Sequence, residues 1–412
     1  MESKIESFDA IVVGAGPGGA TTSALLARRG KRVLVLDQSS FPRDKVCGDG
    51  ISGKSLDAIR ELGLEDRFDN AETLGSWGVT FSGPYGDQVS IPFGKQLTGK
   101  SAPGFVSTRM AFDKVLFDAA LEEGADIRVN STVTGLIKDG DRVTGVRYKT
   151  PDSQPAEAYA PIVIGADGAY SVVARELGMD QLEEKHYVAA VRAYFDGVTG
   201  FNAGNFIELH FVEDVIPGYF WIFPLPHGQA NVGVGMLSSE IKKRNVKLKP
   251  LLDAMIKHPR FKDRFTNATQ VTPTKGWGLP VGSKPRTMAG DGWLLIGDAA
   301  SLIDPFSGEG IGNAMVTGMK AADWIDRAAT ANDYSARFLA GYEKEVLDLL
   351  RGEFRLSHMM QKLGRWKWLL NTVIAKASRS RELADTISCM FDDLSERKKL
   401  LTLGFYWRVL TA

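Results

Sequence analysis

A cluster of glycines near the start of the chain has the spacing that binds phosphate groups. Gly14, Gly16 and Gly19 match the pattern G-x-G-x-x-G, with Ala15 between the first two. The first glycine permits a tight turn, the second lets the backbone approach a pyrophosphate, and the third lets a strand and a helix pack closely. Free N–H groups at the start of the following helix favour an anion. Asp37 follows about twenty residues on, where a carboxylate accepts hydrogen bonds from a dinucleotide ribose.

Two aspartates farther along the chain each follow an apolar run with a glycine near its end. Asp167 follows the run 162–166, and Asp298 follows 294–297. The carboxyl ends of strands converge on the ligand crevice of an open α/β sheet. A plain strand-to-loop turn has the same sequence. In the crevice, Asp298 would bond the ribityl chain of a flavin while Asp167 braces the surrounding loops, so the two segments favour FAD over NAD.

The segment after Asp298 is rich in glycine and precedes a predicted helix. Its candidate cofactor contacts are Pro305, Gly308, Gly310, Ile311 and Gly312. Backbone N–H groups and a helix N-terminus in this segment would face the pyrimidine edge of a flavin ring. Positive dipoles at that edge stabilise the reduced, anionic ring. A glycine-rich connector without a ligand is the alternative.

Three further side chains are candidates for work on a substrate. Cys47 lies in a loop flanked by glycine. A lone cysteine is most often a small core residue, but a thiol near a reacting carbon can donate the proton that completes hydride addition to a C=C bond. Tyr219 and Trp221 share one face of a predicted strand by its two-residue period. That face suits either a substrate pocket or the core of a sheet.

Two groups of charges also allow two interpretations each. Arg43 and Lys45 are either solvated loop residues or contacts to a pyrophosphate or an anionic substrate head. Near the end of the chain, Trp366 and Trp368 alternate with cations, and the run 397–399 precedes another apolar stretch. Basic helices that carry tryptophan can lie on a membrane interface. An ordinary packed helix with its cations outward has the same pattern.

The elements that must position these residues follow from the apolar periodicity. A strand over 10–13, a turn over 14–19, a helix over 20–29 and a strand over 31–36 form a βαβ unit of about thirty residues. A helix is predicted over 107–123, where apolar residues recur at helical spacing. Two more strands of the same sheet are predicted over 162–164 and 293–296.

The middle of the chain has a different pattern. Short strand-like runs at 187–195, 206–211, 219–223 and 230–236 are separated by Gly, Pro and Asn, as in an antiparallel sheet. From about residue 314 the pattern is helical. The predicted class is α/β, with a Rossmann-type FAD-binding domain, an inserted antiparallel-sheet substrate domain and a helical C-terminal region. The predicted boundaries assign 1–75, 105–185 and 276–330 to the FAD-binding domain, 76–104 and 186–275 to the substrate domain, and 331–412 to the helical region.

Composition limits the classes of function. The 412 residues include 50 basic and 50 acidic side chains, and this balance argues against a nucleic-acid partner. Two cysteines, Cys47 and Cys389, build no disulfide framework and no metal cluster, so we expect no metal and a reducing, cytoplasmic setting. The first residues lack the features of a signal peptide. No run reaches the roughly 18–20 apolar residues of a membrane span.

Taken in order, these motifs resemble those of a known group of flavoproteins. The chain resembles the para-hydroxybenzoate hydroxylase-like superfamily in five motifs. They are the glycine turn, the acid-ended strand, Arg109 to Asp113, the Asp-Gly at 167–168 and the Gly-Asp at 297–298. Within it, the segments 41–52, 217–224 and 230–235 resemble the geranylgeranyl reductase family of FAD-dependent oxidoreductases. The resemblance covers roughly residues 8–330 and implies the same fold. Asp49 departs from the small residues that are frequent at its position in isoprenoid reductases.

The resemblance also implies roles for particular residues. FAD would contact Arg109, the backbone near Val133, Ala15, Gly48, Gly50, Gly310 and Ile311. Cys47 would lie on the substrate side of the flavin, and Tyr219 and Trp221 would line the pocket. The implied reaction is reduction of C=C bonds in an isoprenoid or similar apolar substrate, with electrons from an external donor, NAD(P)H or a ferredoxin-like protein.

The same fold also hosts other chemistry, so the alternatives stay open. An FAD monooxygenase or halogenase-like enzyme would use a flavin hydroperoxide. Halogenases of this fold carry a Trp-x-Trp-x-Ile-Pro segment, and the counterpart here, 219–224, has tyrosine at the first position. A flavin-binding sensor or carrier without turnover is the third class.

Overall fold

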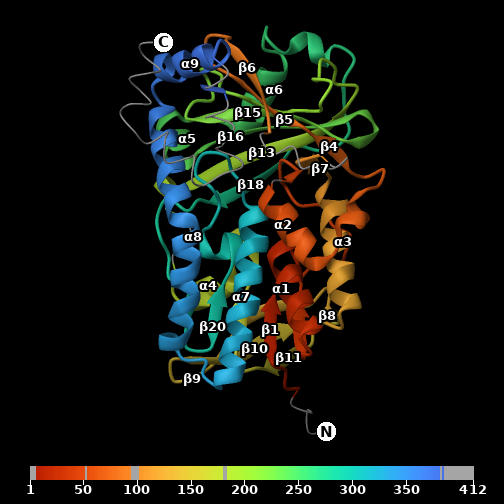
Figure 1. Cartoon of the computed structure of the whole chain (residues 1–412), viewed down its shortest axis with the longest axis vertical. Coiled ribbons are helices and arrows are strands. Elements are labelled where there is room, and N and C mark those ends of the chain that lie inside the picture. Colours follow the sequence, from red (N-terminus) through yellow and green to blue (C-terminus); the bar gives the residue numbers. More distant parts are fainter. Residues whose placement is uncertain (1–5, 52, 94–101, 180–182, 381–382, 385–412) are drawn as a thin grey trace.

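The computed structural model describes residues 6–51, 53–93, 102–179, 183–380 and 383–384. They form an elongated molecule in which a Rossmann-type part and a part built on a large, mostly antiparallel sheet are stacked along the long axis (Figure 1). The predicted fold class, with its helical C-terminal region, is confirmed. The numbered domain boundaries stay a prediction.

The Rossmann-type part is built on a six-stranded sheet with the order β19-β20-β12-β1-β2-β8. Its ladders are parallel except for the pair of β19 and β20. Its central strands are completely buried because helices and a second sheet cover them. The strands are β1 (Ala10–Val13), β2 (Val33–Leu36), β8 (Asp126–Arg128), β12 (Val163–Gly165), β19 (Ala289–Gly290) and β20 (Trp293–Leu295).

Helices from both ends of the chain and a small antiparallel sheet share the core of this part. The helices are α1 (Pro17–Arg28), α2 (Gly53–Leu62), α3 (Arg109–Glu122), α4 (Val172–Glu176), α7 (Ile311–Ala331) and α8 (Ala336–Leu363), and the sheet has the order β11-β10-β9. Its strands are β9 (Thr132–Asp139), β10 (Arg142–Lys149) and β11 (Pro155–Tyr159). A further small sheet joins β3 (Gly50–Ile51), β7 (Gly104–Val106) and β4 (Leu74–Ser76).

Two glycine segments predicted as turns are partly helical, which corrects their predicted ends. α1 begins at Pro17, so Gly19 lies inside the helix, and α7 (Ile311–Ala331) begins early enough to include Gly312. Proline is favoured at the first helical position, because its missing N–H has no partner there in any helix. This proline accounts for the start of α1, and both helices begin directly at their glycine turns, with Gly16 and Gly310 as N-caps.

The second part is an eight-stranded sheet with the order β17-β13-β16-β15-β14-β5-β6, in which β18 also pairs with β13. All four strands predicted for the middle of the chain are present, within a few residues of their expected ends. The strands are β5 (Gly78–Ser82), β6 (Gln88–Pro92), β13 (Tyr187–Asp196), β14 (Ile207–His210), β15 (Gly218–Pro224), β16 (Gln229–Leu237), β17 (Thr269–Gln270) and β18 (Lys275–Pro280).

Helices pack on both faces of this sheet. Apolar side chains of α6 (Leu248–Ile256) join one core with β13, β15 and β16, and α5 (Ser238–Arg244) lies against β13 and β16. α8 (Ala336–Leu363) runs along one side of both parts, and α9 (Lys367–Ala377) packs on β5 and β6 (Figure 1). None of the helices in the described ranges combines the length and the apolar character needed to cross a bilayer. The basic run 397–399 and Cys389 lie outside the described residues.

Candidate active site

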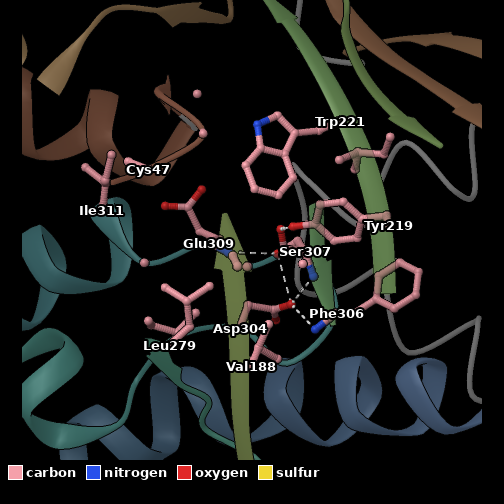
Figure 2. A pocket seen from close by; sticks show the side chains of 18 of the residues that line it. Cys47, Val188, Tyr219, Trp221, Leu279, Asp304, Phe306, Ser307, Glu309 and Ile311 are labelled. Carbon is pink, nitrogen blue, oxygen red and sulfur yellow. Dashed lines mark hydrogen bonds between the residues drawn. The ribbon is translucent and has the colours of Figure 1, made fainter. Parts of the chain in front are cut away.

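A cavity of about 260 Å³ lies between the Rossmann-type part and the large sheet. One wall comes from the segments 45–51 and 303–311, and the other comes from β13, β14, β15, β16 and β18. Figure 2 shows Cys47 and Ile311 on one side of it and Tyr219 and Trp221 on the other. The cavity brings together these predicted site residues: Cys47, Gly48, Gly50, Arg109, Tyr219, Trp221, Asp298, Pro305, Gly308, Gly310 and Ile311.

The remaining predicted cofactor contacts lie away from the cavity wall, and most of them surround the start of α1. Pro17, the first residue of α1, does line the cavity, so the glycine turn continues directly from it. The residues outside the wall are Gly14, Ala15, Gly16, Gly19, Asp37, Arg43, Val133, Asp167 and Gly312.

The glycine turn has the form that a pyrophosphate requires. Gly14 adopts φ +99°, and a Cβ on Gly19 would overlap the Gly14 carbonyl oxygen, so neither position accepts a side chain. At Gly16 no side chain caps the helix, and a Cβ would meet nothing closer than Arg43 Nη2 at 3.5 Å. Uncapped N–H groups beside a guanidinium form a site for an anion. The residues present therefore fit the diphosphate of a dinucleotide.

Arg43 and Arg109 are held by one buried carboxylate. Asp113 accepts from Arg109 Nε at 2.6 Å and Nη2 at 2.7 Å, and its Oδ2 lies 2.9 Å from Arg43 Nη1. The Arg43 guanidinium also stacks over the Phe41 ring, 4.7 Å from its centroid. Since two cations share one carboxylate, positive charge remains beside the glycine turn.

Asp37 joins the second strand to the glycine turn. Its carboxylate accepts from the N–H groups of Ala15 and Ser39, both at 2.8 Å. Its carbonyl accepts from Ser131 N–H at 2.8 Å, and this bond brings the start of β9 close to the turn. Val133 on β9 is buried in the core, so only its backbone is available for a ligand.

The two strand-end aspartates have different surroundings. Asp167 accepts from Val172 N–H at 2.7 Å and Val173 N–H at 3.1 Å, and burial raises its pKa. It therefore braces the turn after β12 against the first turn of α4, whose N-cap is Ser171. Asp298 lies on the cavity wall, where its Oδ2 is 3.4 Å from Lys45 Nζ.

The loop before α7 leads into a helix N-terminus whose N–H groups can donate to an oxygen atom. The Glu309 carboxylate accepts from Gly312 N–H at 2.7 Å. The buried Asp304 fixes the loop by accepting from the N–H groups of Phe306 at 2.9 Å and Ser307 at 2.7 Å (Figure 2). Tyr219 donates to the Ser307 carbonyl at 2.6 Å and so ties the loop to the large sheet.

The loop around Cys47 holds a residue that the sequence interpretation did not count as functional. Asp49 lines the cavity, is fully buried, and accepts from Tyr194 Oη at 2.7 Å and Asn231 Nδ2 at 2.8 Å. Asn231 also donates to the Cys47 carbonyl at 2.7 Å and accepts from Trp221 Nε1 at 2.9 Å. These partners come from distant strands, so no local motif joins them. The one sequence signal was a charged residue between two glycines.

Lys54 and Glu353 form a second polar pair on the cavity wall that the sequence interpretation missed. Lys54 Nζ lies 2.6 Å from Glu353 Oε2 and donates to Asn313 Oδ1 at 2.8 Å. Their helices, α2 and α8, are far apart in the chain. The pair therefore links the C-terminal helical region to the cavity.

Comparisons with known proteins agree with this geometry. A family model described as "FAD binding domain" matches residues 7–349. The menaquinone reductase of Mycobacterium tuberculosis is 34% identical over 78% of this chain and 77% of its own length. The digeranylgeranylglycerophospholipid reductase of Thermoplasma volcanium is 30% identical over 95% of this chain and 93% of its own length.

Solved structures with the same fold extend the comparison. A geranylgeranyl bacteriochlorophyll reductase-like protein from Thermoplasma acidophilum superposes with a TM-score of 0.83 at 26% identity, covering 97% of this chain and 100% of that one. A flavin-dependent brominase superposes with a TM-score of 0.78 at 22% identity, covering 98% and 99%. At this identity, the similarity to the brominase supports a shared fold and nothing more.

Proposed function

Because this chain belongs to the FAD-binding domain family, we propose that it reduces C=C bonds of an isoprenoid or similar apolar substrate. FAD as the predicted cofactor is confirmed, and the protein is an FAD-dependent oxidoreductase. The resemblance to the geranylgeranyl reductase family is confirmed as well. The relatives carry the names of reductases of menaquinone and of digeranylgeranylglycerophospholipid, which supports the proposed class of substrate.

The residues around the glycine turn would hold FAD. Gly16 and Arg43 would contact its pyrophosphate, Asp37 its ribose, and Asp298 its ribityl chain. The N-terminus of α7, beyond Gly310, would face the pyrimidine edge of the ring. Once reduced by the external donor, bound FAD would supply a hydride, which carries both electrons of the reaction.

The observation that most supports the proposal is an apolar cavity next to this cofactor site. Its wall on the large sheet includes Leu209, Trp221 and Phe223, while the opposite wall includes Cys47. Aromatic and aliphatic side chains of this kind bury a hydrocarbon chain and exclude water from it. Reduction of an alkene also needs a proton, and the segment from Cys47 to Asp49 would provide it.

The alternative, a monooxygenase or halogenase-like enzyme, has less support in the cavity. Lys45 and Lys54 are the lysines among the described residues that line it, and each lies against a carboxylate, of Asp298 and Glu353 respectively. Each cavity lysine therefore already has a counter-charge within the protein. The fold alone does not separate the reactions.

Oxygen dependence distinguishes the two reactions. Enzyme reduced with dithionite under strict anaerobiosis should convert a prenyl alkene to the saturated product, because no oxidant takes part. The measurement is product formation by mass spectrometry, with FAD-free protein as the control. A turnover that requires oxygen would contradict the reductase proposal, and donor consumption without any product would favour a carrier.

We also propose an external electron donor, NAD(P)H or a ferredoxin-like protein, and a peripheral membrane contact at the start of α9. Trp366 and Trp368 are 59% and 50% exposed, and they follow Gly364, which lines the cavity. Exposed tryptophans that follow closely on a residue of an apolar cavity wall suit transfer of a lipid substrate. Lys367 pairs with Glu213, so the contribution of charge is smaller than the sequence suggests.

Vesicle flotation tests the membrane contact. The double variant Trp366→Ala and Trp368→Ala should float less well with anionic vesicles than the parent protein. Leu121→Ala on α3, where a large side chain is 43% exposed on the Rossmann-type part, is the matched control and should float like the parent. A parent protein that stays with the soluble fraction at low salt would exclude the contact.

A further inference from the structure

The surroundings of the Asp49 side chain suit a proton-donating acid better than a purely structural carboxylate. Its Oδ2 has two donors, Tyr194 and Asn231, but its Oδ1 is buried without a hydrogen-bond partner. An ionised carboxylate with an orphaned buried oxygen is costly. A proton on Oδ1 lowers that cost, because the group becomes neutral, and it turns the oxygen into a donor on the wall of the cavity.

The charged and titratable groups around Asp49 come from β13, from α3 and from the loop 44–47. Arg192 on β13 is fully buried, with its guanidinium carbon 4.1 Å above the Tyr194 ring, and its charge is shared with Asp44. Arg109 on α3 acts from another side, and its charge is shared with Asp113. Burial outweighs both arginines and raises the pKa of Asp49 to about 6. A group of this kind exchanges its proton near neutral pH, as a general acid must.

Cys47 is the rival acid in the same loop. Its Sγ accepts from Asp49 N–H at 3.4 Å, and burial raises the pKa of the thiol above its ordinary value. A thiol whose pKa lies far above the working pH is a weaker acid than a carboxyl group whose pKa is about 6. The loop therefore holds two candidates for the proton donor, of which Asp49 is the stronger acid and Cys47 the weaker.

Resting on the proposed function, we propose that Asp49 supplies the proton for alkene reduction. Hydride from the reduced flavin would form the C–H bond at one alkene carbon, bringing both electrons and leaving the flavin oxidised until the external donor reduces it again. The O–H bond of Asp49 breaks, and its proton forms the C–H bond at the other carbon. Asp49 remains as a carboxylate, stabilised by Tyr194 and Asn231, and regains its proton from water.

Asp49→Asn is the direct test, because it keeps the shape of the side chain and removes the acid. Asp49 adopts φ +67°, a conformation that asparagine tolerates, so the variant is expected to fold. With unchanged flavin content and unchanged flavin reduction by dithionite, product formation should fall ~10²-fold or more. A variant within threefold of the parent would overturn the proposal.

A readout without turnover separates this proposal from the proposed function. The infrared band of a buried protonated carboxyl should be present in FAD-free parent protein at pH 5, fade as the pH rises through about 6, and be absent from Asp49→Asn. A spectrum in which Asp49→Asn removes no such band would refute the acid assignment. If the band titrates but no prenyl alkene is ever reduced, the proposed function fails instead.

Tyr194→Phe provides a second, independent variant. It removes a hydrogen bond that stabilises the carboxylate but keeps the ring beneath Arg192, so the pKa of Asp49 should rise. The activity, which falls as the pH passes the pKa of the acid, should then fall at a higher pH than in the parent. An unshifted profile would count against Asp49, and so would a reaction that needs Cys47 but tolerates Asp49→Asn.

Discussion

At the scale of single residues, Gly16 and Gly19 share one motif but have different tasks. Gly16→Val should leave the fold intact, since a Cβ there meets only the end of Arg43 at 3.5 Å and its φ of −68° suits any residue. The new side chain would occupy the space of the pyrophosphate, so the purified protein should be colourless. Flavin absorbance per chain and the melting temperature of the FAD-free protein measure the two effects.

Gly19→Ala is the contrasting variant at this turn. Its Cβ would overlap the Gly14 carbonyl oxygen, so the FAD-free protein itself should lose stability. Full flavin content in Gly16→Val would show that the phosphate turn is assigned wrongly.

Asp113 is the residue on which the two arginines depend. Asp113→Asn leaves the buried guanidinium of Arg109 without its counter-charge and should lower the free energy of unfolding by about 3 kcal/mol or more. Asp118→Asn on the same helix is the control, because its pair with Lys114 also spans four residues but is exposed to water. It should cost at most about 0.5 kcal/mol. Chemical denaturation of both variants measures the difference, and equal losses would contradict it.

At the scale of elements, the contact between α1 and α7 aligns the two helix starts that face the cofactor site. The helices approach closely at Gly18 and Gly318, where Thr22 Oγ1 donates to the Gly18 carbonyl at 2.8 Å and the Gly318 carbonyl at 3.2 Å. A Cβ on Gly318 would lie 2.7 Å from the Gly18 carbonyl oxygen. Because that oxygen belongs to the backbone, the helices would have to separate.

Gly318→Ala should therefore destabilise the protein by about 1–3 kcal/mol and weaken FAD binding. The matched control is Gly352→Ala in the middle of α8, where a Cβ meets nothing within 4 Å. It gains helix propensity and should stabilise the protein by up to about 1 kcal/mol. Denaturant melts and flavin titration compare the two, and a stabilised Gly318→Ala would show that the helices have room to spare.

At the scale of the whole molecule, local patterns predicted the cofactor and the strands better than the active site. The strand over 10–13 and the four strands of the large sheet follow from short-range apolar patterns, and they are present. The start of α1 was placed too late, because glycines in a helical first turn look like a loop. The contacts of Asp49 with Tyr194 and Asn231 join residues separated by 145 and 182 positions. Only the paired sheet brings them together.

The length of the proposed cofactor site, from the glycine turn to the cavity, leads to a prediction about global stability. A ligand that binds only the folded state stabilises it in proportion to the logarithm of its concentration, by about 2.7 kcal/mol at a hundredfold excess over its Kd. FAD would engage both the glycine turn with Asp37 and the α7 N-terminus at the cavity. FMN lacks the adenosine half, so it would engage only the second site.

The melting temperature of FAD-free protein should therefore rise steadily with added FAD and much less with equal FMN. Gly16→Val should reduce the effect of FAD to that of FMN, because only the pyrophosphate site is blocked, whereas Leu121→Ala should respond like the parent. Differential scanning fluorimetry over a range of flavin concentrations measures these shifts. Equal shifts with FAD and FMN would mean that Gly16 and Asp37 do not bind the adenosine half, because the binding energy would then come from the cavity end alone.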